Sequence, residues 1–148
     1  MFWLIVPLGY LLGSIPTAYI FGRFIIGQDI RHLGDANVGA ANAYRTLGAK
    51  YGIAVYLLDL TKGVLAVLIA QWANLPQIWV FITGGAAVIG HNWPVFLGFR
   101  GGRGESTTIG TLYIINPIPA LIMTIPTIFT LVVFKNVILT SAFLFVLL

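Results

Sequence analysis

The sequence predicts an all-α protein, a polytopic transmembrane helical bundle with about five to six membrane segments that include a half-helix. Of its 148 residues, 59% are hydrophobic and only 8% are charged, whereas a soluble domain carries about 25% charged residues. The mean hydropathy is +0.97. A membrane β-barrel would instead show alternating strands of about ten residues, and the sequence has no such alternation.

Three apolar runs are each long enough to cross a hydrocarbon core of about 30 Å. They cover residues 2–22, 51–72 and 77–99. The first contains Gly13–Pro16, which predicts a kink because proline lacks an N–H donor. Residues 23–50 are polar and rich in glycine, asparagine and arginine, so we expect a loop with tight turns between the first two spans.

Shorter apolar segments follow. Residues 106–115 would make about 15 Å of helix, too short to cross a membrane unaided, and predict a half-helix. The sequence Asn-Pro-Ile-Pro at 116–119 breaks it, residues 120–134 form another span, and residues 137–148 begin a partial one. Because no repeat or linker interrupts the chain, we interpret residues 1–148 as a single membrane domain.

The charged residues indicate the topology. Eight of the twelve lie between Arg23 and Lys62, and three more lie between Arg100 and Glu105. The positive-inside rule then places both polar loops in the cytoplasm and the N-terminus outside. We therefore expect a multi-pass protein of the inner (plasma) membrane.

Composition also argues against several kinds of partner. The net charge of +4 is small and follows the membrane topology, so it does not indicate nucleic-acid binding. The absence of cysteine excludes a disulfide framework and a cysteine-ligated metal. His32 and His91 lie far apart without a carboxylate in ligand spacing, so we expect no metal site.

The stretch that follows the third span indicates a phosphate site at the membrane surface. Glycine lets a backbone approach a ligand closely, and arginine offers a planar fork of donors to phosphate oxygens. The start of the half-helix, at Thr107, adds the free N–H groups that favour an anion. The candidate ligand-binding residues of this loop are Arg100, Gly101, Gly102, Arg103, Gly104 and Thr107.

The first polar loop has the same character. Its candidate residues are Arg31, Asn37, Gly39, Asn42 and Arg45. Both loops are rich in small residues and both face the cytoplasm, so we expect them to converge on one anionic ligand. The alternative is that the arginines anchor helices at lipid headgroups, and we favour that alternative for two other cations, Arg23 and Lys50.

Charged and polar residues inside the spans form a third group. Asp59 and Lys62 lie within the second span, where exposing each charge to lipid would cost about 2.5–3.5 kcal/mol, so we expect both to face the protein interior. They are either functional or a neutral pair that holds helices together. His91, near the end of the third span, is either a phosphate donor or proton carrier, or a polar interfacial residue.

Several short motifs occur in order over residues 8–135. They are Gly-Ser-Ile-Pro-Thr-Ala at 13–18, Asp29-Ile30-Arg31, Asn37-x-Gly39-Ala40-x-Asn42-x-x-Arg45, Leu58-Asp59-x-x-Lys62-Gly63, Gly90-His91-x-x-Pro94-x-Phe96 and Gly101-Gly102-x-Gly104. Together they resemble the bacterial integral-membrane glycerol-3-phosphate acyltransferases that use acyl phosphate as the donor.

The resemblance implies acyl transfer from acyl phosphate to sn-glycerol 3-phosphate, which gives lysophosphatidic acid for phospholipid synthesis. It implies no metal, cofactor, acyl-CoA or acyl carrier protein, and its partners are the two substrates and membrane lipids. Carried onto this chain, the candidate catalytic residues are Asn42, Arg45 and His91. The candidate substrate-binding residues are Arg31, Asn37, Gly39, Lys62, Arg100, Gly101, Gly102, Arg103, Gly104 and Thr107.

The chain departs from the family pattern at Asp35, where the family typically has serine, and it lacks a third motif with histidine, asparagine and glutamate. It is therefore either a fragment or a shortened, divergent member. We expect the 148 residues to bind phosphate ligands weakly and to turn over little acyl phosphate. Two other functions remain: an anion transporter or channel built on the broken helix, and a non-catalytic phosphate- or lipid-binding relative.

Overall fold

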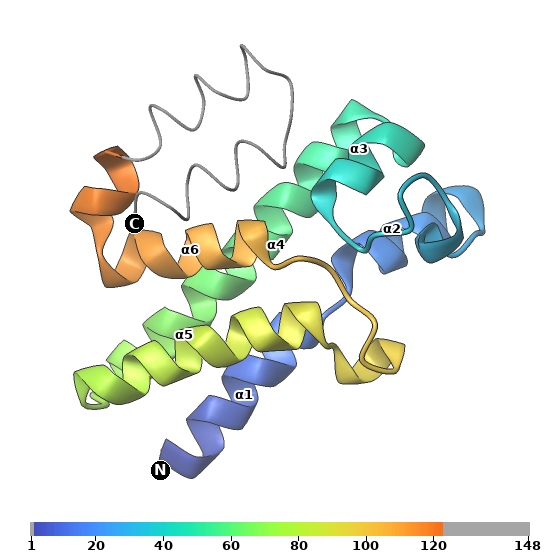
Figure 1. The fold of residues 1–148 in the computed structure, drawn as a ribbon. Helices are drawn as coiled ribbons and strands as arrows, with labels where there is room; N and C mark the ends of the chain where they lie inside the picture. The colour runs from blue at the N-terminus through green and yellow to red at the C-terminus, as the bar shows by residue number, and fades with distance from the viewer. Residues whose placement is uncertain (1, 123–148) are drawn as a thin grey trace.

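The computed structural model of the chain describes residues 2–122, which form a helical bundle (Figure 1). No strand occurs within this range. The elements in chain order are α1 (Phe2–Ser14), α2 (Thr17–Ile26), the 3-10 turn η1 (Ile30–His32), α3 (Ala40–Leu47), α4 (Ala49–Trp72), α5 (Gln77–Asn92), the 3-10 turn η2 (Val95–Leu97) and α6 (Glu105–Ile115). The segment predicted over 137–148, and all but the first three residues of that over 120–134, lie outside the described residues.

Three stretches in this part of the chain are long and apolar enough to cross a membrane: Phe2–Ile26, Ala49–Trp72 and Gln77–Leu97. They correspond to the three apolar runs of the sequence, with different ends. The first continues to Ile26, beyond the predicted end at residue 22. Arg23 lies within α2, where its guanidinium donates to the Tyr19 hydroxyl one turn back at 3.2 Å, and the helix ends before Gly27, whose φ is 68°.

The predicted kink in the first span is a complete break between α1 and α2. Pro16 disfavours helical geometry at Ile15, the residue before it. The break leaves the Ile15 carbonyl outside the regular helical pattern, and this carbonyl accepts hydrogen bonds from the Thr17 N–H at 3.1 Å and from the Lys62 ammonium at 3.1 Å. Lys62, on α4, therefore supplies a hydrogen-bond donor to the backbone at the break in the first span.

α1 lies against α5, and α6 lies against α4 (Figure 1). Glycine makes the α1–α5 contact possible, since a Cβ on Gly13 would collide with the backbone of Ala87, and one on Gly90 would collide with that of Tyr10. This is the close packing of small residues expected between membrane helices.

Two predictions about the polar segments need correction. Residues 23–50 were expected to form a loop with tight turns, but they contain the eight-residue helix α3. This helix is amphipathic and packs on α4. The third span was expected to remain regular to residue 99, but α5 ends at Asn92. Pro94 explains the early end, because its ring is incompatible with a continuing helix.

α6 starts at Glu105 and ends at Ile115, close to the half-helix predicted for 106–115. Helix resumes directly over 117–122, so the break predicted over 116–119 is a single bend at Asn116. Pro117 tolerates this arrangement because the first position of a helix needs no N–H donor.

The buried interior has an apolar cluster at each end of α4. Val55 belongs to the cluster beneath the polar loops, with Ala18 and Ile30. Val67 belongs to the other cluster, with Val80. The charged pair predicted to face the interior lies between these clusters.

Candidate functional site

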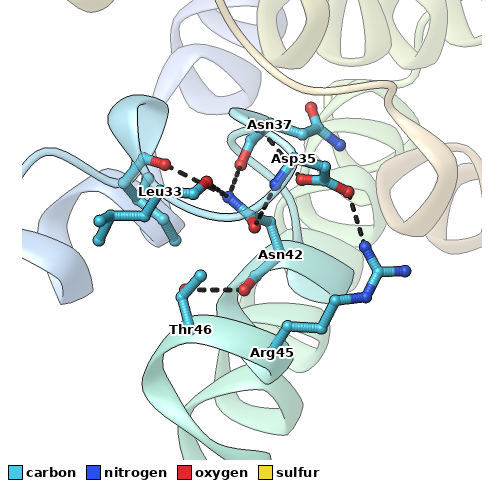
Figure 2. A network of polar contacts seen from close by, with 7 residues as sticks. Leu33, Asp35, Asn37, Asn42, Arg45 and Thr46 are labelled. Carbon is cyan, nitrogen blue, oxygen red and sulfur yellow. Dashed lines mark hydrogen bonds and ion pairs between the residues drawn. The ribbon is translucent and has the colours of Figure 1, made fainter.

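Asn42 organises the first polar loop (Figure 2). Its side chain is fully buried. The amide nitrogen donates to three carbonyls: those of Ile30 at 3.3 Å, Leu33 at 3.0 Å and Asn37 at 2.9 Å. The amide oxygen accepts from the Asp35 N–H at 3.2 Å. The catalytic role predicted for Asn42 stays a prediction, and the structure gives this side chain the separate task of fixing the loop backbone.

Arg45 projects from α3 toward the same loop and contacts Asp35 (Figure 2). The Arg45 Nη1 to Asp35 Oδ2 distance is 2.8 Å, and the side chains are 55% and 32% exposed. Asp35 thus neutralises an arginine predicted to bind phosphate. The pair is exposed enough for a stronger anion to compete for the guanidinium, because exposed ion pairs contribute only about 0–1 kcal/mol.

Arg31 forms the better-enclosed ion pair of this loop. Its Nη2 lies 2.7 Å from Asp29 Oδ2, and its Nη1 donates to the Leu97 carbonyl at 3.2 Å. The hydrogen bond to Arg31 lowers the pKa of Asp29 to about 2, and the carboxylate in turn raises the pKa of Arg31. Because Leu97 precedes the glycine loop, Arg31 connects the two polar segments.

The two polar loops approach each other, as expected, and their binding of one anionic ligand stays a prediction. A cavity of about 380 Å³ is lined by Arg31, His32, Ala36, Val38, Arg100 and Gly101. The Val38 carbonyl also lies against Gly102, where a side chain would collide with it. The cavity thus brings at least one arginine from each polar segment to a single space.

The glycine loop folds back onto the end of α5. The N–H groups of Gly101 and Gly102 donate to the carbonyls of Asn92 and His91, each at 3.1 Å. These two N–H groups therefore stabilise the fold of the loop, and the predicted contact of Gly101 and Gly102 with a ligand stays a prediction. Glycine is needed at Gly102 because a Cβ there would collide with Nε2 of His91.

Gly104, with a φ of 78°, caps α6 in the left-handed conformation that glycine adopts readily. The Thr108 N–H makes the first intrahelical bond of α6, to the Gly104 carbonyl. The three preceding N–H groups lie in the first turn, where helices leave donors for a ligand. Thr107 is buried within this turn, and its hydroxyl has no hydrogen-bond partner in the described part of the chain.

Arg100 and Arg103 are both exposed. Within residues 2–122 neither forms a hydrogen bond or ion pair with another side chain. Their guanidinium groups therefore keep all their donors for a ligand or for lipid headgroups. Asn37 and Gly39, the other two loop candidates, are partly exposed beside the Asn42 network.

A buried polar cluster lies below the loops. Asp59 is 1% exposed and Lys62 5% exposed, which confirms that both face the interior. Lys62 Nζ is 2.9 Å from Asp59 Oδ1, and the same oxygen accepts from the Thr17 hydroxyl at 2.5 Å. His91 Nδ1 lies 3.7 Å from this oxygen.

Sequence reasoning missed Asp29 and Thr17, the partners of Arg31 and Asp59. A usable signal existed for Thr17, since a hydroxyl directly after a helix break inside a membrane span needs a polar partner. In the described residues no group of three or more histidines, cysteines or carboxylates is placed to hold a metal ion.

The chain is similar to known acyltransferases. The family model "Glycerol-3-phosphate acyltransferase" matches residues 3–148. A protein named glycerol-3-phosphate acyltransferase 4, from Dehalococcoides mccartyi (strain ATCC BAA-2266), is 51% identical over 96% of this chain and 77% of its own length. Glycerol-3-phosphate acyltransferase from Geotalea daltonii is 46% identical over 89% of this chain and 68% of its own length.

Solved structures give the same result. A crystal structure of PlsY (YgiH), an integral membrane glycerol 3-phosphate acyltransferase in its glycerol 3-phosphate form, matches with a TM-score of 0.92. That match has 35% identity and covers 99% of this chain and 73% of the other. The lysophosphatidic acid form matches with a TM-score of 0.74 and 29% identity, over 99% of this chain and 87% of the other.

The chain spans only part of the length of these relatives. It covers 77% of the Dehalococcoides mccartyi protein named above and 53% of a glycerol-3-phosphate acyltransferase 4 from a second strain of that species. The match nevertheless covers almost all of this chain, including both polar loops and the buried cluster. This chain belongs to the glycerol-3-phosphate acyltransferase family.

Proposed function

We propose that this protein transfers an acyl group from acyl phosphate to sn-glycerol 3-phosphate, which yields lysophosphatidic acid and inorganic phosphate. The observation that carries the proposal is the cavity of about 380 Å³ shared by the two polar loops. It presents Arg31 and Arg100 to one space, and both substrates carry a phosphate group. Relatives named for this activity support the choice of substrate class.

The cations of the two polar loops suit a phosphate ligand. Arg100 and Arg103 have no hydrogen-bond or ion-pair partner within residues 2–122, and Arg45 is held by one exposed ion pair with Asp35. A planar guanidinium binds phosphate through two parallel hydrogen bonds, which fixes orientation as well as charge. Arg31 forms an ion pair with Asp29 and donates a hydrogen bond to the Leu97 carbonyl. We therefore propose that its main role is structural, as part of the cavity wall.

The chemistry we propose is mainly the alignment of two bound substrates. A glycerol hydroxyl attacks the acyl carbon, the bond between that carbon and the phosphate oxygen breaks, and phosphate leaves with the electron pair. Holding the reacting atoms together removes much of the barrier. Arginines then stabilise the negative charge that develops on the leaving phosphate.

The hydroxyl proton needs an acceptor, for which we propose Nε2 of His91. This nitrogen lies against Gly102 in the glycine loop, close to the cavity-lining Gly101. The leaving phosphate can accept the proton instead, so His91 aids catalysis without being its only route. We further propose that both loops face the cytoplasm, with the N-terminus outside, because the cations concentrate there.

The test is an assay of the full-length protein in detergent with labelled glycerol 3-phosphate and acyl phosphate. Arg45→Ala and Arg103→Ala should each lower kcat/KM by about ten- to hundredfold, since a hydrogen bond to a charged group contributes about 1.5–3 kcal/mol. Arg23→Ala is the control, because Arg23 lies on α2, donates to the Tyr19 hydroxyl and is not among the candidate site residues.

Unchanged turnover in both arginine variants would place the site elsewhere. Uptake of labelled glycerol 3-phosphate into vesicles without product would indicate a transporter. Binding without either uptake or product would indicate a non-catalytic relative.

A further inference from the structure

We propose that the end of α2 nearest the polar loops is a binding site for an anionic phospholipid. In this site Arg23 binds the headgroup phosphate, and exposed apolar side chains of the same helix contact the lipid chains. The sequence alone favours headgroup contact for Arg23, and the structure adds a guanidinium whose orientation is fixed. The site is separate from the proposed transfer reaction, because it uses none of the residues assigned to that reaction.

Tyr19 fixes the guanidinium of Arg23. The Arg23 Nε donates to the Tyr19 hydroxyl at 3.2 Å, and the guanidinium carbon lies 5.4 Å from the centre of the Tyr19 ring. Tyr19 is partly buried and packs against the apolar cluster beneath the polar loops. The hydrogen bond uses only Nε, so both terminal nitrogens of Arg23 keep their donors within the described residues. Donors in one plane match two oxygens of a phosphate group.

The charge of Arg23 is not balanced by a carboxylate within residues 2–122. Arg31 stacks on the same Tyr19 ring, at 5.5 Å, but its charge is balanced by Asp29 at 2.7 Å. Two guanidinium groups beside one ring repel each other unless their charges are balanced. An anionic headgroup at Arg23 would supply the negative charge that Asp29 supplies to Arg31.

The neighbours of Arg23 indicate that this anion carries hydrocarbon chains. Ile20 is 37% exposed and Phe24 is 84% exposed. Helical spacing places both on one side of Arg23, whereas Tyr19 lies on its other side. α2 ends the apolar stretch Phe2–Ile26, so Arg23 lies near the end of a span, at the depth of lipid headgroups. A soluble phosphate would leave Ile20 and Phe24 without a contact, and a phospholipid would cover them.

The first experiment measures binding of phosphatidylglycerol to the full-length protein in a neutral detergent, by native mass spectrometry. Arg23→Gln should weaken binding by about tenfold or more, because hydrogen bonds to charged groups contribute at least that factor. Arg23→Lys keeps the charge but loses the planar fork, and should weaken binding by about threefold or more.

Lys50→Gln is the matched control. Lys50 is another exposed cation beside a tyrosine, with its Nζ 5.8 Å from the centre of the Tyr51 ring, but no hydroxyl holds it. Its loss should weaken binding by less than about fivefold, the contribution of one basic residue at a charged surface. If Arg23→Lys binds as well as the unaltered protein, or if Arg23→Gln and Lys50→Gln have equal effects, any cation at this depth suffices and the proposal is wrong.

The second experiment tests the lipid chains. Phe24→Ala should weaken phosphatidylglycerol binding by about threefold or more, because it removes apolar area from the contact. Ile25→Ala is its control, since Ile25 is 43% exposed on a different side of α2. Inorganic phosphate in large excess should leave the lipid bound. Displacement would show a site for the free ion, and equal binding of phosphatidylcholine would show that headgroup charge is not recognised; either result would overturn the proposal.

Thermal unfolding supplies an independent measurement. Because the altered side chains are exposed, the variants should have similar midpoints without lipid. Added phosphatidylglycerol should raise the midpoint of the unaltered protein, since a ligand that binds the folded state stabilises it, and should raise that of Arg23→Gln less. Equal rises would contradict the proposal. Neither measurement involves turnover, and the transferase assay contains no phosphatidylglycerol, so Arg23→Ala remains suitable as the control of that assay.

Discussion

Asn42→Ala is the substitution whose effect on the site is best defined by the structure. It removes an amide with four hydrogen bonds, but the loss is not equal for the four partners. The carbonyl of Ile30 also accepts from the Leu33 N–H, and that of Leu33 also accepts from the Ala36 N–H. The Asn37 carbonyl and the Asp35 N–H, by contrast, have Asn42 as their partner.

Two backbone groups are thus left without a bond. An unsatisfied buried group costs about 1–3 kcal/mol, and water reaches this partly exposed loop, so we expect a total near 2–4 kcal/mol. For a chain of this size that corresponds to a fall of roughly 4–16 °C in the unfolding midpoint. The same substitution should loosen residues 33–39 and lower transferase activity, because this loop carries one wall of the cavity.

The assay is thermal unfolding in detergent, together with the rate of limited proteolysis within the loop. Asn37→Ala is the matched control, since its side-chain amide makes no hydrogen bond within the described residues and its removal should change stability by less than about 0.5 kcal/mol. Equal midpoints and equal cleavage rates for the two variants would refute the assignment of Asn42 as the organiser of this loop.

Three further predictions concern the ion pairs and the glycine loop. Asp35→Ser should strengthen phosphate binding measured by calorimetry, because it releases Arg45 from its 2.8 Å ion pair; weaker binding would show that Asp35 helps to position the guanidinium. Asp29 has a pKa lowered from 3.8 to about 2, so its ion pair with Arg31 stabilises the fold above pH of about 4 and is lost as pH falls toward 2. Unfolding midpoints measured over this range should fall more steeply for the unaltered protein than for Asp29→Asn. Gly102→Ala should lower activity at least tenfold by displacing the His91 ring, since general acid–base catalysis contributes about 10²–10⁴-fold; an unchanged rate would show that this contact is not part of the site.

Much of the architecture follows from sequence features with one physical meaning. Long uncharged runs and the positions of the cations predict the helices and their polar ends, and the proline at 16 predicts a kink where the structure has a break between α1 and α2. Lys62 was expected to face the interior because lipid exposure would be costly, and it does. These inferences need only local composition and the properties of the bilayer.

The parts that sequence reasoning missed depend on contacts between distant segments. α3 was not predicted because its residues are also typical of turns, and packing on α4 decides their conformation. The hydrogen bonds of the Gly101 and Gly102 N–H groups to the end of α5 could not be predicted, because nothing in the local sequence indicates them. The hydrogen bonds of the Asn42 side chain to the loop backbone likewise depend on the tertiary fold.

The helix break and the candidate site are parts of one arrangement. A break at Ile15 within a membrane span leaves a backbone carbonyl outside the helical pattern, and the Lys62 ammonium donates to it together with the Thr17 N–H. A buried ammonium in turn requires an anion, which is Asp59, and that carboxylate lies beside the ring of His91. Polar contacts thus continue from the Ile15 carbonyl through Lys62 and Asp59 to His91, beside the glycine loop. The order of these contacts explains why polar residues buried in an apolar chain lie beside the proposed phosphate site.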